Sequence, residues 1–144
     1  MITKSHIVDG ALQMLAVEGL LLQPMADDQR IAIQHLDDMA AAYTALGLDG
    51  GYIAPLEYGT SQGSDDSGVD VGLAGPYKAL LAAYIAQQYG KQIDPAKTDW
   101  AMKMLQAQSI ESVGTTKYPV TLPIGSGNYD GPHDDAFYHG GLPI

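Results

Sequence analysis

Apolar residues recur every three or four positions in four stretches of the chain, which is the spacing of one helix face. The first stretch predicts a helix from about Lys4 to Val17. Thr3 or Ser5 is suited to cap its start, and Gly19 to end it. The residues that form its apolar stripe are Ile7, Val8, Ala11, Leu12 and Leu15.

The second stretch predicts a long helix from about Asp28 to Leu46. Asp27 can accept the free amide hydrogens at its start, where acidic side chains also suit the positive end of the helix dipole. Gly47 fits the left-handed residue that ends many helices. The apolar face is expected to contain Ile33, Leu36, Met39, Ala40, Tyr43 and Leu46.

The third stretch predicts a helix capped by Gly75, with Pro76 in its first position and Gly90 at its end. The residues expected on one face are Tyr77, Leu80, Leu81, Tyr84, Ile85 and Gln88. We expect the helix tyrosines, Tyr43 included, to belong to the core.

The fourth helix is predicted to start at Asp94 and Pro95 and to fade near Ser112. The residues expected to share its main apolar face are Trp100, Met104, Ala107 and Ile110, with Ala101 and Leu105 beside them. Isolated helices of this length are marginal in water. These helices must therefore pack against each other or against a neighbouring subunit.

No helical period survives in residues 48–75, where glycines and Pro55 interrupt the chain. Residues 52–58 fit a short strand, and residues 61–71 fit a polar, acidic loop, so either a loop or a short hairpin is expected. Residues 113–144 hold four of the eight prolines and six of the seventeen glycines, which excludes a long helix there. The sequence predicts a mainly α fold: a four-helix body at 1–112, a Gly/Asp-rich loop or short hairpin at 48–75, and an extended C-terminal arm at 113–144.

Charge excludes one large class of function. The chain has seventeen acidic and seven basic residues and a net charge of −10, whereas a protein that grips nucleic acid phosphates needs a basic face. The absence of cysteine excludes disulfides, cysteine zinc sites and a thiol nucleophile. No apolar run is long enough for a membrane span, and residues 1–9 lack the apolar core of a secretory signal.

Several short motifs resemble catalytic or nucleotide-binding sites. The run Gly59-Thr60-Ser61-Gln62-Gly63 matches the nucleophile elbow of hydrolases, but an acidic loop follows it where that motif needs a helix. The run from Gly125 to Asp130 begins like a dinucleotide fingerprint and lacks the third glycine and a following helix. Gly90 and Lys91 lack the remainder of a phosphate loop. We expect none of these motifs to be functional.

Side chains that could bind metal or act as acids also occur. The candidate metal ligands are His133, Asp134, Asp135 and His139 in the arm, and His35 with Asp38 on the second helix. Their spacing fits no standard site, so a polar tail and a solvated helix face are the preferred interpretations. Glu57 with Asp65 or Asp66 could form the carboxyl pair of a glycosidase. Among so many acids some pair always exists, and we favour an acidic solvated loop.

The arm carries the more informative pattern. Tyrosines outside the helices accompany a proline-spaced segment with alternating apolar residues, Val120, Leu122 and Ile124. Such a segment suits a groove or a sheet edge of another chain. Disordered tails seldom hold apolar residues at this density. We therefore predict that the arm docks on a partner.

The chain resembles the head-to-tail connectors of short-tailed phages, also called tail accessory factors, head completion proteins or packaged-DNA stabilisation proteins. One part of the likeness runs from Thr3-Lys4 through the residues at 11–17, 36–39 and 46–52. The more specific part is Lys117-Tyr118-Pro119 followed by 122–128. The likeness does not extend to the Asp-rich loop or to the residues after Asn128.

The resemblance implies a structural subunit and no catalytic, cofactor-binding or metal-binding residues. Twelve copies would form a ring under the portal, close the DNA-filled head and receive the tail tube or nozzle protein. Packaged DNA would pass through the lumen without specific binding. The protein would be made in the host cytoplasm and reside at the head–tail junction of the virion. The portal-binding residues would be Tyr118, Pro119, Leu122, Pro123, Ile124, Gly125, Ser126, Gly127 and Asn128. The remaining alternatives are a tail-associated cell-wall hydrolase and a generic small helical adaptor.

Overall fold

The computed structural model describes residues 1–17 and 26–112, with side chains up to residue 109. These residues form α1 (Lys4–Val17), α2 (Ala26–Ala45), the 3-10 turn η1 (Val71–Leu73), α3 (Ala74–Gln88) and α4 (Pro95–Ser112). The predicted mainly α, four-helix body is confirmed. Gly19 and the arm at 113–144 lie outside the described residues. Within the described ranges, no helix combines the length and hydropathy that crossing a membrane requires.

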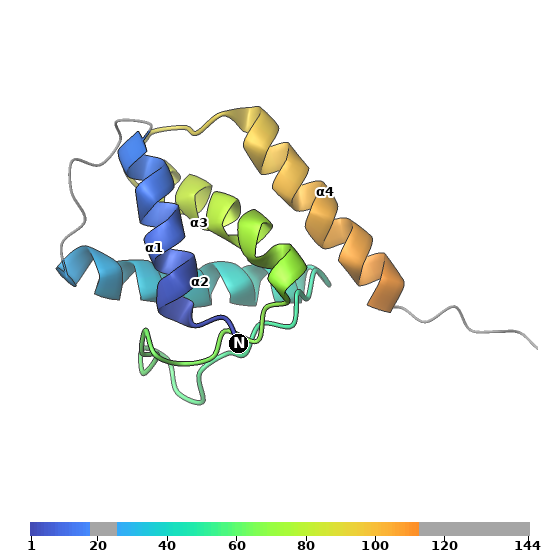
Figure 1. Ribbon diagram of the computed structural model, residues 1–144, viewed down its shortest axis with the longest axis horizontal. Coiled ribbons are helices and arrows are strands. Elements are labelled where there is room, and N and C mark those ends of the chain that lie inside the picture. The colour runs from blue at the N-terminus through green and yellow to red at the C-terminus, as the bar shows by residue number, and fades with distance from the viewer. Residues whose placement is uncertain (18–25, 113–144) are drawn as a thin grey trace, which may run out of the picture. The chain divides into compact units, whose positions relative to one another are not determined.

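Helix α3 occupies the centre of the body. It packs against α1, α2 and α4, and α2 crosses beneath α1 and α3 (Figure 1). Its buried residues lie on almost every side of the helix, as expected for a helix surrounded by others: Pro76, Tyr77, Ala79, Leu80, Leu81, Ala82, Ala83, Ile85 and Ala86. The many alanines let neighbouring helices approach closely, so α3 can contact each of the three other helices.

Helices α1 and α2 bury the faces that their periodicity predicts. The predicted stripe of α1 is buried completely, and Gly47 after α2 has the predicted left-handed backbone, with φ of 77°. Leu46 is an exception, because it lies beyond the last turn of α2 and is 71% exposed. Tyr77 is buried as predicted, whereas Tyr43 and Tyr84 are only partly buried and pack at the margin of the core.

The start of α3 differs from the prediction. Gly75 is not its cap, because the helix begins at Ala74 and continues from η1. The turn itself is capped by Asp70, whose Oδ1 accepts a hydrogen bond from the Val71 backbone N at 2.7 Å. The capping residue thus lies five residues before the predicted one, since the 3-10 turn extends the helix towards the N-terminus.

The buried face of α4 was also predicted wrongly. Ala101 and Leu105 are buried, whereas Trp100 is 50% exposed and Met104 39% exposed. Helix α4 packs mainly on α3 and lies at the edge of the body (Figure 1). Its narrow buried line therefore uses small and branched residues, and the two largest apolar side chains face outwards.

Of the two options for residues 48–75, the loop is the one found. Residues 52–58 form no strand; the segment is joined to residue 67 by one bond, from Ile53 N to Ser67 O at 2.8 Å. An isolated antiparallel bridge pairs Thr3 with Asp66. The N-terminal segment of the chain is thus one of the partners of the loop.

Candidate functional site

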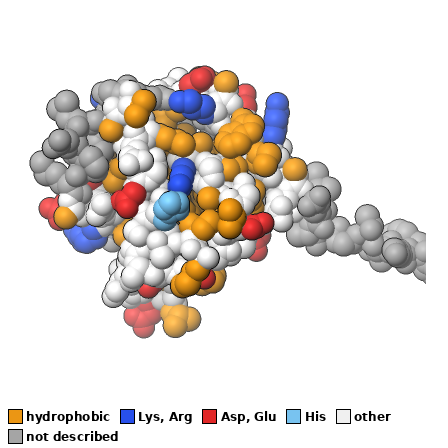
Figure 2. Space-filling model, viewed as in Figure 1, with side chains coloured by type: hydrophobic (Ala, Val, Ile, Leu, Met, Phe, Trp, Pro, Cys, Tyr) orange, Lys and Arg blue, Asp and Glu red, His pale blue; other side chains and the backbone are white. Residues whose placement is uncertain are grey.

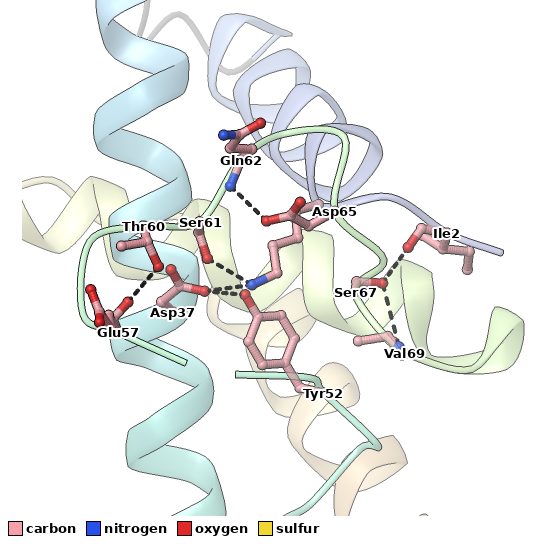
Figure 3. Close-up of polar contacts among 11 residues, drawn as sticks. Ile2, Asp37, Tyr52, Glu57, Thr60, Ser61, Gln62, Asp65, Ser67 and Val69 are labelled. Atoms are coloured by element: carbon pink, nitrogen blue, oxygen red, sulfur yellow. Dashed lines mark hydrogen bonds and ion pairs between the residues drawn. The ribbon is translucent and has the colours of Figure 1, made fainter. Parts of the chain in front are cut away.

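A buried lysine organises the end of the body from which the loop projects. Lys4, in the first turn of α1, is only 2% exposed. Its ammonium donates to Asp37 Oδ1 of α2 at 3.0 Å and to Ser61 Oγ of the loop at 2.8 Å (Figure 3). A buried charge is stable only when it is paired and hydrogen-bonded. We call Lys4, Asp37, Tyr52 and Ser61 the Lys4 cluster.

Tyr52 closes the cluster from the loop side. Its hydroxyl donates a hydrogen bond to Asp37 Oδ1, and the Lys4 ammonium lies 4.8 Å from the centre of its ring. The ring stacks on Tyr77 of α3, with 6.2 Å between centroids. Burial, together with the hydrogen bond to Asp37, raises the pKa of Tyr52 far above its usual range. The cluster therefore ties α1, α2, α3 and the loop together through one neutral phenol and one ion pair.

The cluster brings the serine of the elbow-like motif beside a lysine, which is one arrangement of nucleophilic catalysis. A lysine that activates serine must accept its proton. Here the Lys4 ammonium donates to both Asp37 and Ser61, so it offers no lone pair to the hydroxyl. The geometry suits a structural tie better than an acyl-transfer site.

One oxygen of the cluster is unsatisfied. Asp37 Oδ2 is buried and has no hydrogen-bond partner among the described residues. Breaking a buried ion pair by removing one partner leaves the other charge uncompensated, at a cost of about 3–5 kcal/mol. Loss of either Lys4 or Asp37 is therefore expected to destabilise the whole Lys4 cluster, and with it the attachment of the loop to the body.

Backbone bonds fix the loop against the N-terminus. Lys4 N donates to Asp65 O and Ser5 N to Gly63 O, both at 2.9 Å. Ser67 donates to the Ile2 carbonyl through its backbone N, at 2.9 Å, and through its hydroxyl, at 2.6 Å (Figure 3). These bonds fasten the second half of the loop to the first five residues of the chain.

A set of apolar side chains is exposed on this fixed loop. Leu56 is fully exposed, Tyr58 is 81% exposed and Ile53 is 54% exposed. The turn that carries them is closed by Thr60, whose Oγ1 donates to the Glu57 carbonyl at 2.8 Å. We call residues 53–58 the loop tip. Apolar groups held out in water on an ordered loop are typical of an interaction surface.

A second surface lies between α1, α3 and α4. It is a hollow of about 360 Å³ lined by Gly10, Gln13, Met14, Val17, Lys78 and Lys97, and we call it the lysine groove. The stem of Lys78 lies directly across Gly10, where a Cβ would collide with it. Figure 2 shows a basic side chain next to a histidine near the middle of this face, with hydrophobic side chains around them. An apolar floor between amines suits a partner that is both apolar and acidic.

The acids that were weighed as a glycosidase pair all lie in the loop. Glu57 is exposed at the loop tip, whereas Asp65 and Asp66 accept hydrogen bonds from the backbone of Gln62 and Gly68. These two carboxylates stabilise turns within the loop.

The other candidates are distributed as follows. His35 packs against Tyr84, with ring centroids 5.7 Å apart, and Asp38 accepts a bond from Tyr58 at 3.4 Å. In the described part of the chain, no three potential metal ligands gather at one point. The arm residues from Tyr118 to Asn128, the Gly125 motif and the candidate ligands at 133–139 lie outside the described residues.

Sequence reasoning missed the Lys4 cluster, although the signal was present. Lys4 precedes Ile7 and Val8 by three and four positions, so it lies on the buried stripe of α1. Asp37 lies four residues after Ile33, on the buried face of α2. Opposite charges on two stripes that must face each other predict a buried ion pair.

Comparison with known proteins adds no further assignment. No protein-family model matches the chain, and a search of curated protein sequences finds no significant match. The resemblance to phage connectors thus stays a prediction from the motifs.

Proposed function

We propose that this protein is a structural head-to-tail connector of a short-tailed phage. Copies of it form a ring, with twelve as the expected number, under the portal. The ring closes the filled head and receives the tail tube or nozzle protein. It resides at the head–tail junction of the virion after synthesis in the host cytoplasm. No bond is made or broken in this role, and it calls for no cofactor.

The observation that carries the proposal for the body is the outward face of α4. Trp100 and Met104 are exposed on a helix that packs mainly on one neighbour. Single exposed apolar side chains are common, whereas contiguous ones mark interaction surfaces, and Trp100 and Met104 lie one turn apart on the same helix. A ring in which each copy contacts the next through different surfaces would cover such a face.

Charge supports a ring that forms only on its target. Copies with a net charge of −10 repel one another at long range in solution. Docking of each arm on the portal would raise the local concentration of subunits and offset that repulsion. The same acidity would let packaged DNA pass through the lumen without sticking, because phosphates and carboxylates repel each other.

The test is capture by the portal ring of the same phage. The full chain is expected to bind, and a chain ending at Ser112 is expected to lose binding while its helical circular dichroism stays nearly unchanged. Leu122→Asp should weaken capture in the full chain, with Ile144→Asp, outside the matching motif, as the control. Equal capture of the full and shortened chains would overturn the proposal.

Sedimentation of the isolated protein tests the second part of the proposal. At physiological salt a monomer is expected, because nothing then overcomes the repulsion between copies. A stable dodecamer in the absence of the portal would contradict assembly on the target. If the isolated protein is a monomer, electron microscopy of the protein mixed with portal rings should reveal an added ring.

A further inference from the structure

We propose that neighbouring copies join by inserting the loop tip of one, residues 53–58, into the lysine groove of the next. This rests on the proposed ring in one respect only, namely that copies meet side by side. The occupant is thus a second copy of this chain. Three features of the described body support the pairing: the two shapes, their charges and their places on different elements of the body.

The loop tip has the properties of an inserting element. Leu56, at its apex, has no contact that shields it from water, and Tyr58 and Ile53 are exposed beside it. The tip is held by the Lys4 cluster, the backbone bonds to the N-terminus and the Thr60 turn. A pre-ordered segment loses little conformational entropy on binding, so a small contact can still be productive.

The lysine groove has the properties of a receiving element. Its volume of about 360 Å³ is near the lower end of the range for ligand pockets, roughly 300–1,000 Å³, and fits a few side chains. Gly10 and Met14 provide an apolar floor, and Lys78 and Lys97 stand at its sides. The apolar surface continues onto α4, where the Trp100 ring lies over Gly75, one turn before Lys78.

The distribution of charge favours a contact in which the acidic loop of one copy faces the lysines of the next. Residues 1–72 hold eleven acidic and two basic residues, whereas residues 73–112 hold four lysines and three acids. The tip brings Glu57, and the loop behind it brings Asp65 and Asp66, towards Lys78 and Lys97 of the neighbour. Because both copies are acidic overall, this pairing is among the few contacts between them that attract.

The tip and the groove of one molecule lie on different elements. Tyr58 of the tip bonds to Asp38 of α2 at 3.4 Å, whereas the groove is lined by residues of α1, α3 and α4 and by none of α2. Lys78 of the groove contacts its own molecule, since its ammonium lies 3.1 Å from His6 Nε2. With its tip bonded to α2, each copy offers its tip to one neighbour and its groove to another. Such contacts propagate head to tail and can close into a ring.

A mixing experiment isolates this contact. One chain carries Leu56→Asp, which spoils its tip and leaves its groove intact. The other carries Lys78→Glu and Lys97→Glu, which spoils its groove and leaves its tip intact. In the mixture, the tip of the second chain and the groove of the first are the one intact pair. With the first chain labelled with 15N, the amide signals of Gly10, Met14 and Lys78 should shift with increasing second chain, and high salt should weaken binding several-fold.

The control adds Leu56→Asp to the second chain, and the shifts should then fall at least tenfold at equal concentration. Leu46→Asp and Lys91→Glu are matched changes at exposed positions outside both surfaces, and should leave the shifts unchanged. Absent shifts at millimolar concentration, shifts elsewhere on the body, or shifts that survive the control would each overturn the inference.

The lack of cysteine provides a second readout that does not depend on weak equilibrium binding. A chain with both Leu56→Cys and Gln13→Cys should form a ladder of disulfide-linked multimers under mild oxidation. A chain with Leu46→Cys and Gln13→Cys should form them far more slowly, and equal rates would contradict the pairing. Portal capture separates the two proposals. Capture without tip–groove contact refutes only this inference, and contact without capture refutes only the proposed connector.

Discussion

The two ends of the described body are held by different kinds of interaction. At the loop end, a buried ion pair, a stacked tyrosine pair and several backbone bonds fix a segment that has no regular secondary structure. At the α4 end, a regular helix is held mainly by one neighbour through a narrow apolar line. The irregular segment is therefore held by directional polar bonds, and the regular helix by apolar packing.

This difference indicates how each region can serve an assembly. A loop whose shape is fixed by directional bonds presents its exposed side chains in one arrangement before any partner arrives. A helix that packs mainly on one neighbour leaves its outer face open to a second one. Both regions expose large apolar side chains, the loop from an irregular segment and α4 from a regular helix.

The largest effect is expected at the Lys4 cluster. Lys4→Met should lower the free energy of unfolding by about 3–5 kcal/mol, because it leaves the Asp37 carboxylate buried and unpaired. Urea denaturation measures the change. Lys4→Met with Asp37→Leu should recover much of the loss, and Lys103→Met, at an exposed lysine of α4, should stay within about 0.5 kcal/mol. A loss below about 1 kcal/mol for the single variant would show that the loop is not held by this pair.

The next effect concerns the backbone of the loop. Gly68 has φ of 71°, and a Cβ there would collide with the Gly51 carbonyl oxygen and the Ile53 side chain. Gly68→Ala should lower the free energy of unfolding by about 2–4 kcal/mol through strain and this collision. Gly47, with φ of 77° and no atom within 4 Å of such a Cβ, is the matched control, since its replacement by Ala adds only strain of about 1–2 kcal/mol. Equal losses of unfolding free energy for Gly68→Ala and Gly47→Ala would mean that the loop backbone shifts to accommodate the new methyl group.

An effect of intermediate size is expected from alkaline pH, which should lower the free energy of unfolding. Burial, and after it the charge of Asp49, raises the pKa of Tyr77 to about 12. The unfolded state then loses the tyrosine proton first, near pH 10, so stability is complete below that pH and falls as pH rises towards 12. The loss from this group should be on the order of 2 kcal/mol. Urea midpoints measured against pH provide the test, and Tyr77→Phe should flatten the decline; an unchanged slope would contradict it.

The smallest effect is expected on the outer face of α4. Met104→Ser should change the free energy of unfolding by less than about 1 kcal/mol, because that side chain already contacts water. Leu105→Ala, one residue later and 1% exposed, should cost about 2–5 kcal/mol. Thermal melts of the two variants measure the contrast. A loss for Met104→Ser that matches Leu105→Ala would mean that α4 buries the face predicted from its sequence.

The helices of this protein were largely predictable from local pattern. The stripe of α1, the acidic first turn of α2, the left-handed Gly47 and the end of α3 before Gly90 follow from spacing and from single-residue preferences. The cap of α3 was placed wrongly, because a 3-10 turn beginning after Asp70 precedes it. Local rules locate elements well and their boundaries less well, since short turns add residues at either end.

Which face of a helix packs on its neighbour was harder to predict than where the helix lies in the sequence. Periodicity assigned Trp100 and Met104 to the main face of α4, and both lie outside the buried line of Ala101 and Leu105. A helix with apolar residues on two adjacent faces does not specify which one meets the core. That choice depends on the surface of α3, where Gly75 lies beside the Trp100 ring.

The sequence by itself determined the number and order of the helices, the breaks between them and the acidic charge, because these depend on neighbours along the chain. The positions of Lys4 and Asp37 on two buried stripes already indicated their ion pair. Tertiary structure alone decided that Tyr52 and Ser61 of the loop join that pair, and that the loop tip is held out in water. The reason is physical. Contacts that span 15 to 57 positions depend on how several elements pack at once, and no local preference encodes that arrangement.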